Sequence, residues 1–313
     1  MLRFLIKRLI ATLPVVVGVA IVVFLILRLA PGDPAAVLAG GTATPETVAE
    51  IRQKLGLDAP LLTQFFTWAG LVLHGNLGTS IITHQPVWNL ILQRAEPTLS
   101  LGATTFVVSI VFAVPLGVLA AWYHQTWVDR VVMIISVLGF SIPAFVVGYL
   151  LVYLFAIDLK WLPVQGFANI SRGIGPFISY ITLPTITLSL FYGALIARIT
   201  RASILEVLGE DYIRTARAKG LRESTVMTRH ALRVAAGPII SIVGIGLAML
   251  ISGALITESV FNLPGLGRLT VDAVMSRDYP VIQGLILVLS LVYILINVLV
   301  DIAYAVVDPR IRY

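Results

Sequence analysis

Six stretches of the chain are long, apolar and free of Asp, Glu, Lys and Arg, which is the pattern of membrane-spanning helices. A helix needs about 20 mostly apolar residues to cross the hydrocarbon core of a bilayer. The six stretches are residues 9–27, 98–122, 131–157, 177–197, 238–257 and 279–300. The pattern therefore predicts an all-α integral membrane protein with six transmembrane helices.

Some residues inside these stretches bear on helix shape and packing. The second, third and fourth stretches contain Pro115, Pro143 and Pro184. Each proline frees a backbone carbonyl and permits a kink, which suits alternating access but is also common in membrane helices. Small residues recur every fourth position at Ala113, Gly117 and Ala121, so this face can approach either another span or a second subunit closely.

The first apolar run follows three basic residues, as in a signal peptide, but it is longer than the apolar region of most signal peptides. Arg28 also stands where a cleavage site would be expected. We therefore expect residues 1–30 to form a cytoplasmic N-terminus and a retained first span. Residues 31–97 form an insertion too long for a simple connector, with one short helix starting near Thr44 and a second, interfacial helix at 61–73.

The composition agrees with a membrane protein and argues against several kinds of chemistry. Apolar residues make up 58% of the chain and charged residues 12%, whereas soluble proteins average about 25% charged residues. The chain has no cysteine, which excludes disulfides and thiol catalysis. The four histidines lack metal-ligand spacing, and no nucleophile with a base or phosphate-binding glycine loop occurs. We therefore predict neither a metal site nor an enzyme.

The distribution of positive charge predicts the topology. With six spans both termini lie on one side, and that side holds 14 of the 22 Lys and Arg residues, eight of them between residues 198 and 237. Because positive loops favour the cytoplasm, we expect both termini and this loop inside, with 31–97 outside. The net charge of +6 then reflects loops that face anionic lipid, not nucleic acid.

The loop between the fourth and fifth spans carries a predicted amphipathic helix at 210–219, ended by Gly220. Glu210 and Arg214 stand four residues apart, as in a helical ion pair. A second helix is expected from Ser224. The residues alone leave two interpretations open, a helix held to lipid head groups by its basic side chains or a docking surface for another protein.

At this loop the sequence resembles a known family. The run from Asp211 to Gly220, followed by His230-Ala231-Leu232-Arg233, resembles the coupling loop of ABC importer permeases of the dipeptide/oligopeptide/nickel group, closest to dipeptide or glutathione types. Arg214-Thr215 replace the Glu-Ala of the general form, while Ala216 and Gly220 fit it. Further landmarks are Pro31-Gly32-Asp33-Pro34, Leu55-Gly56-Leu57-Asp58, and the runs from Gly75 to Ser80, Ser141 to Phe145, Glu258 to Arg268, Arg277 to Pro280 and Asp308 to Tyr313. Asn76 departs from the family pattern, which usually has Asp at that position.

The resemblance implies that residues 98–313 form a five-span permease core with a coupling loop at about 200–237. It implies half of the pathway of a peptide importer in a bacterial inner membrane. The implied partners are a homologous second permease, two cytoplasmic ATPases that bind ATP and Mg, an extracytoplasmic solute-binding protein and the bilayer. No cofactor is expected in this chain. The coupling residues would be Asp211, Tyr212, Arg214, Thr215, Ala216, Arg217, Ala218, Lys219, Gly220 and Leu221.

Two alternatives remain at this point. An importer of the same family could carry nickel or another non-peptide solute. A secondary transporter would need no ATPase, but it would be expected to show inverted repeats and ionisable residues at mid-membrane depth, and neither is evident.

Only Glu258 and Asp301 lie inside or beside the apolar runs, where a charge is costly. Asp301 suits a buried structural carboxylate, with a proton or ion relay as the alternative. Glu258 should point into the protein. It would either line the outer mouth of the pathway or form a structural pair with Arg28 or Arg268, and we favour the structural pair.

Overall fold

The structure is a computed structural model that describes residues 2–29, 35–36, 44–54 and 56–307. The described residues form helices and turns, with no strand among them beyond an isolated bridge between Thr79 and Pro86. This confirms the all-helical prediction. The landmarks at 31–34 and from Asp308 onward lie outside the described residues.

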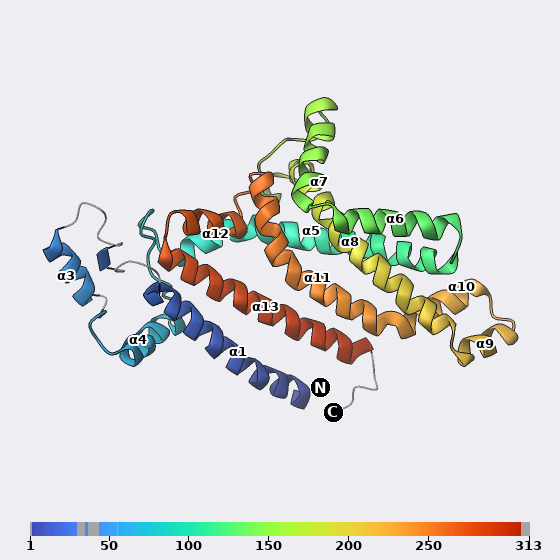
Figure 1. Cartoon of the computed structure of the whole chain (residues 1–313), viewed down its shortest axis with the longest axis horizontal. Helices are drawn as coiled ribbons and strands as arrows, with labels where there is room; N and C mark the ends of the chain where they lie inside the picture. Colours follow the sequence, from blue (N-terminus) through green and yellow to red (C-terminus); the bar gives the residue numbers. More distant parts are fainter. Residues whose placement is uncertain (1, 30–34, 37–43, 55, 308–313) are drawn as a thin grey trace. The chain divides into compact units, whose positions relative to one another are not determined.

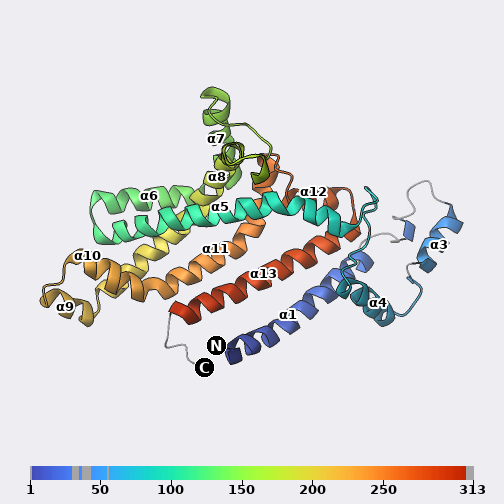
Figure 2. The same ribbon diagram turned by 180° about the vertical axis from the view of Figure 1, so that it is seen from behind.

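The chain divides into two compact units, which are described separately (Figures 1 and 2). The N-terminal unit comprises Leu2–Arg94 and Leu269–Ile294 and contains α1 (Leu2–Leu29), α3 (Pro45–Lys54), α4 (Leu61–Leu73) and the first part of α13 (Tyr279–Val307). The core unit comprises Ala95–Arg268 and Leu295–Tyr313. Its helices are α5 (Val87–Trp122), α6 (Trp127–Ser141), α7 (Ala144–Leu151), α8 (Ile174–Leu208), α9 (Asp211–Ala218), α10 (Glu223–Thr225), α11 (Leu232–Val260) and α12 (Leu266–Met275), of which α5 and α12 continue into the N-terminal unit.

Among the described residues, four helices are long and apolar enough to cross a membrane. They cover Val87–Trp122, Ile174–Leu208, Glu223–Leu250 and Tyr279–Tyr304, and a bent pair, Trp127–Ser141 with Ala144–Asp158, makes a fifth if it counts as one span. In α1 the apolar stretch found is Ile10–Ile26, which is shorter. The structure therefore shows four or five candidate spans, and the count of six stays a prediction.

The third predicted stretch is broken at its proline. Helix α6 ends at Ser141, α7 begins at Ala144, and the two parts are bent by 103°. Proline has no N–H to donate and disfavours helical backbone in the residue before it, and Ile142 is accordingly extended, with ψ 126°. Pro115 and Pro184 instead lie within the continuous helices α5 and α8.

Helix α8 is the central helix of the core unit. In its most apolar stretch 56% of the residues are buried, and it packs against α6, α7 and α11. Close approach depends on glycines: a Cβ at Gly117 of α5 would lie 2.6 Å from the Ala197 carbonyl oxygen, and one at Gly139 of α6 would lie 2.9 Å from the Leu190 oxygen. The small-residue face of α5 therefore meets another span of the same chain.

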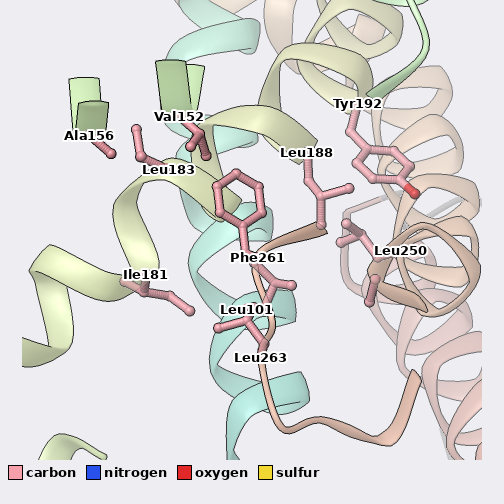
Figure 3. Close-up of a cluster of buried hydrophobic side chains, with 11 residues drawn as sticks. Leu101, Val152, Ala156, Ile181, Leu183, Leu188, Tyr192, Leu250, Phe261 and Leu263 are labelled. Atoms are coloured by element: carbon pink, nitrogen blue, oxygen red, sulfur yellow. The ribbon is translucent and has the colours of Figure 1, made fainter. Parts of the chain in front are cut away.

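A hydrophobic cluster joins α5, α8, α11 and the turn after α11 (Figure 3). Figure 3 shows the Phe261 ring lying among Val152, Leu183 and Leu188. Phe261 is 2% exposed and Leu263 is fully buried, so the turn that leads to α12 is anchored in the core. Within a membrane such contacts stabilise mainly through dispersion and close packing, because lipid tails are as apolar as the side chains.

Candidate functional sites

The loop between α8 and α11 has a defined backbone. Helix α8 is followed by Gly209, and Glu210 is extended before α9 begins at Asp211. Gly220 has φ +76°, a left-handed conformation that glycine adopts without strain. A Cβ at Gly220 would meet nothing within 4 Å, so the position requires glycine for its backbone conformation and not for lack of space.

The inner face of α9 is fixed to the core unit. Ile213 is fully buried and Ala216 is 8% exposed. They belong to a cluster with residues at the end of α8, in the π-helical turn Val226–Ala231 and at the start of α11, including Ile204, Val207, Val226, Met227, Ala231 and Ala235. Helix α9 therefore packs on the turn Val226–Ala231, and the shared cluster connects it to the ends of α8 and α11.

The outer face of α9 is polar and exposed. Tyr212, Arg214, Thr215, Arg217, Ala218, Lys219, Gly220 and Leu221 are all exposed. Figures 1 and 2 both show α9 and α10 beyond the ends of α8 and α11. The ten residues predicted to take part in coupling therefore lie on one short segment. Ala216 is on its packed face, and the others are on or near its open face.

Two ion pairs shape this outer face. Arg214 Nη1 lies 3.2 Å from Asp211 Oδ1, so the predicted pairing of Arg214 with Glu210 is wrong. The reason is that α9 begins at Asp211, which leaves Glu210 outside the helix in extended conformation. Arg217 donates two hydrogen bonds to Glu223, at 2.6 and 3.1 Å, and so links α9 to α10 across Gly220.

Local charges also alter the acidities of this loop. The hydrogen bonds to Glu223 raise the pKa of Arg217, so its guanidinium remains charged. Partial burial, together with the negative charge of Glu210, raises the pKa of the Tyr212 hydroxyl. The exposed face therefore presents fixed positive charge beside a neutral phenol at physiological pH.

Glu258 forms a second site, at the turn between α11 and α12. Its side chain is fully buried. Oε1 accepts a hydrogen bond from Thr98 Oγ1 at 2.5 Å, and Oε2 accepts one from the backbone N–H of Arg268 at 3.0 Å. Thr98 Oγ1 in turn accepts from the Leu266 N–H at 2.8 Å. The carboxylate thus lies at the N-terminus of α12, where the helix dipole favours negative charge.

The residues around the Glu258 carboxylate leave no room for additional side-chain atoms at two neighbouring glycines. A Cβ at Gly265 would collide with the Glu258 carboxylate, and one at Gly267 would lie 2.5 Å from Leu255 Cα. The hydrogen bond from Arg268 comes from its main chain. The side chain of Arg28, the other suggested partner, lies outside the described part of the structure.

The burial and the partners of two further carboxylates, Asp129 and Asp278, were not predicted from the sequence. Asp129, 4% exposed, accepts two hydrogen bonds from Arg201 of α8, and His124 Nδ1 lies 3.1 Å from its Oδ2. In the N-terminal unit, Asp278 accepts from Ser80 Oγ at 2.5 Å. Both acids follow short polar turns between apolar helices, which was the available signal. Within the described residues no group of three His, Asp or Glu side chains could hold a metal ion.

Comparisons with known proteins identify relatives along the whole chain. Residues 113–313 match the family model described as binding-protein-dependent transport system inner membrane component, and residues 1–102 match the model for the N-terminal part of such membrane components. A probable peptide ABC transporter permease of Sinorhizobium fredii is 52% identical over 310 residues, covering 99% of each chain. The glutathione transport system permease of Escherichia coli K12 is 44% identical over 313 residues, covering 100% of each.

A solved structure shares the fold. One chain of the MetNI methionine ABC transporter, in an inward-facing conformation, superposes with a TM-score of 0.59 at 18% identity. The match covers 70% of this chain and 96% of that chain. This likeness concerns the fold alone, whereas the family models and full-length relatives settle the membership. The chain belongs to the family of binding-protein-dependent transport system inner membrane components.

Proposed function

We propose that this chain is one of two permease subunits that form the pathway of an ATP-driven importer of peptides or glutathione-like solutes. The names of the full-length relatives support this solute class. One structural observation carries the coupling role. Through Ile213 and Ala216, helix α9 joins one buried cluster with the turn Val226–Ala231 and the ends of α8 and α11, while its outer face stays open.

The packing of α9 suggests how ATP hydrolysis on partner subunits reaches the pathway. The ATPases bind ATP and Mg and move against each other, and α9 follows the surface on which it docks. Because close-packed interiors transmit displacement, the shared cluster of α9, α8 and α11 carries that movement into two spans. The Arg217–Glu223 link keeps the loop in one shape during the movement.

The topology belongs to the same proposal. Both termini and residues 200–237 lie in the cytoplasm, and α1 is the first of six spans. Residues 31–97 form an extracytoplasmic insertion that meets the solute-binding protein, and 98–313 form the permease core. The excess of Lys and Arg on the side with the termini supports this orientation.

Reconstitution tests the proposal. The chain would be assembled with a homologous permease, two ATPases and a solute-binding protein, and uptake of glutathione and of tripeptides would be measured with and without ATP. Cysteines introduced at Arg217 or Lys219 should cross-link to the ATPase. If cross-links fail and Arg217→Ala transports normally, α9 is a lipid-surface helix. ATP-independent uptake would instead indicate a secondary transporter.

A further inference from the structure

The core unit contains a cavity of about 340 Å³ between α5, α6 and α8. Its walls are mostly apolar, and no charged side chain among the described residues lines it. The cavity opens on the surface of the core unit, where the lining residues Phe112 and Ile135 are 64% and 54% exposed. Small-molecule sites in proteins begin at about 300 Å³, so this cavity can hold a small group. On α5 and α8 the lining residues lie along the middle of long helices, and on the shorter α6 they lie between Val132 and Ser136.

Three serines, one from each helix, border the cavity: Ser109, Ser136 and Ser189. Ser109 is 3% exposed, and among the described residues its hydroxyl has no hydrogen-bond partner. Ser136 is 6% exposed, and within the described part of the chain the Ser189 hydroxyl makes only a long contact of 3.4 Å, to the Thr105 carbonyl oxygen. Hydroxyls of membrane helices usually bond to the carbonyl four residues earlier, as Thr187 does with Leu183.

A buried hydroxyl without a partner is costly, and a lipid tail could not relieve that cost because it has no polar atom. A transported solute could. Polar groups inside membrane helices commonly mark solute pathways for the same reason. The cavity and its serines are thus better suited to an occupant that has both apolar and hydrogen-bonding parts.

We propose that this cavity is a binding site on the translocation pathway for the uncharged part of a peptide, namely an apolar side chain with its adjoining peptide group. The apolar walls receive the side chain, and the serine hydroxyls bond to the peptide C=O or N–H. The neutral lining disfavours charged termini and side chains, because no counter-charge compensates their desolvation. This inference rests on the proposed function and adds a site to it.

Thiol labelling tests the site, because the natural chain contains no cysteine. Ser109→Cys and Ser136→Cys would be introduced singly into the assembled transporter in membranes and treated with 2-aminoethyl methanethiosulfonate. Val107→Cys is the matched control: it lies on the same helix about half a turn away, and Val107 is 55% exposed on the apolar surface. Thiolates, which need water, are the reactive form, so labelling at 109 should be at least about tenfold faster than at 107.

Solute protection provides the second measurement. In a transporter that takes up trileucine or S-methylglutathione, the transported compound should slow labelling at Ser109→Cys. Ser109→Leu should reduce that uptake severalfold, while Val107→Leu should not. Absent labelling at both serine positions, or labelling that neither compound slows, would overturn the site and leave transport itself intact. If neither compound is transported with ATP, the proposed solute class is wrong. Fast labelling at position 109 would then show only that the cavity holds water, and the peptide site would be overturned as well.

Discussion

The guanidinium of Arg201 holds the buried carboxylate of Asp129 through two hydrogen bonds, Nε to Oδ1 at 2.5 Å and Nη2 to Oδ2 at 2.8 Å. Asp129 also accepts from the Gln125 N–H at 3.0 Å. The pair joins the first turn of α6 to α8, and Arg201 lies ten residues before the start of α9. Bidentate arginine–carboxylate pairs fix geometry as well as contribute energy, so this contact fixes the start of α6 against α8.

Removal of one partner from this pair should destabilise the core unit. Asp129→Asn leaves Arg201 without its carboxylate, and breaking a buried pair typically costs roughly 3–5 kcal/mol. The expected result is a lower melting temperature of the purified protein. Asp211→Asn is the control, since the Asp211–Arg214 pair is exposed and should contribute at most about 1 kcal/mol. Equal destabilisation by both variants would contradict this prediction.

The backbone at Gly220 gives a prediction about coupling. A non-glycine residue at φ +76° costs about 1–2 kcal/mol, except that Asn tolerates this conformation better. Gly220→Val should therefore reduce ATP-driven uptake without removing the protein from the membrane, and Gly220→Asn should reduce it less. Gly237→Ala is the control, because that glycine has an ordinary φ and open space for a Cβ. Normal uptake by Gly220→Val would separate α9 from coupling.

Topology can be tested with single cysteines and an impermeant thiol reagent in intact cells. A cysteine at Thr47, in the insertion, should be labelled, and one at Arg222, beside Gly220, should not. The physical reason is the excess of basic residues in the loop around position 222. Labelling of both after the membrane is opened is the control. The reverse pattern in intact cells would place the basic loop outside.

The apolar runs predicted the helical membrane core, because length and hydropathy are local properties of the sequence. Contacts between residues far apart in the sequence could not be predicted in this way. Asp129 and Arg201 are 72 residues apart, and neither lies in an apolar run. One-residue boundaries also mattered. The start of α9 at Asp211 changed the partner of Arg214, and the extended backbone before Pro143 turned a permitted kink into a break of 103°.

The position of Glu258 could be anticipated in part for the same reason. The cost of a charge near hydrocarbon suggested an inward-facing side chain. That the carboxylate accepts a hydrogen bond at the N-terminus of α12 depends on how Pro264-Gly265 turn the chain and on where α12 begins. A search for an oppositely charged partner, such as Arg28 or Arg268, does not reveal this.

The last prediction separates the two interpretations of Glu258. Glu258→Gln keeps the size of the side chain, but its NH₂ group replaces one of two acceptor oxygens, so one donor among Thr98 and the Arg268 N–H loses its partner. A buried donor without a partner costs about 1–3 kcal/mol, and the assembled transporter should become less stable to heat. Thr98→Val should add little to Glu258→Gln if the two side chains act as one unit.

Arg268→Gln is the matched control: it keeps the backbone N–H that bonds to Glu258, so it should not reproduce the loss if the main-chain contact is the important one. Partial rescue of Glu258→Gln by Arg268→Gln would instead support a side-chain ion pair, and a stable transporter with altered uptake would place Glu258 at the mouth of the pathway.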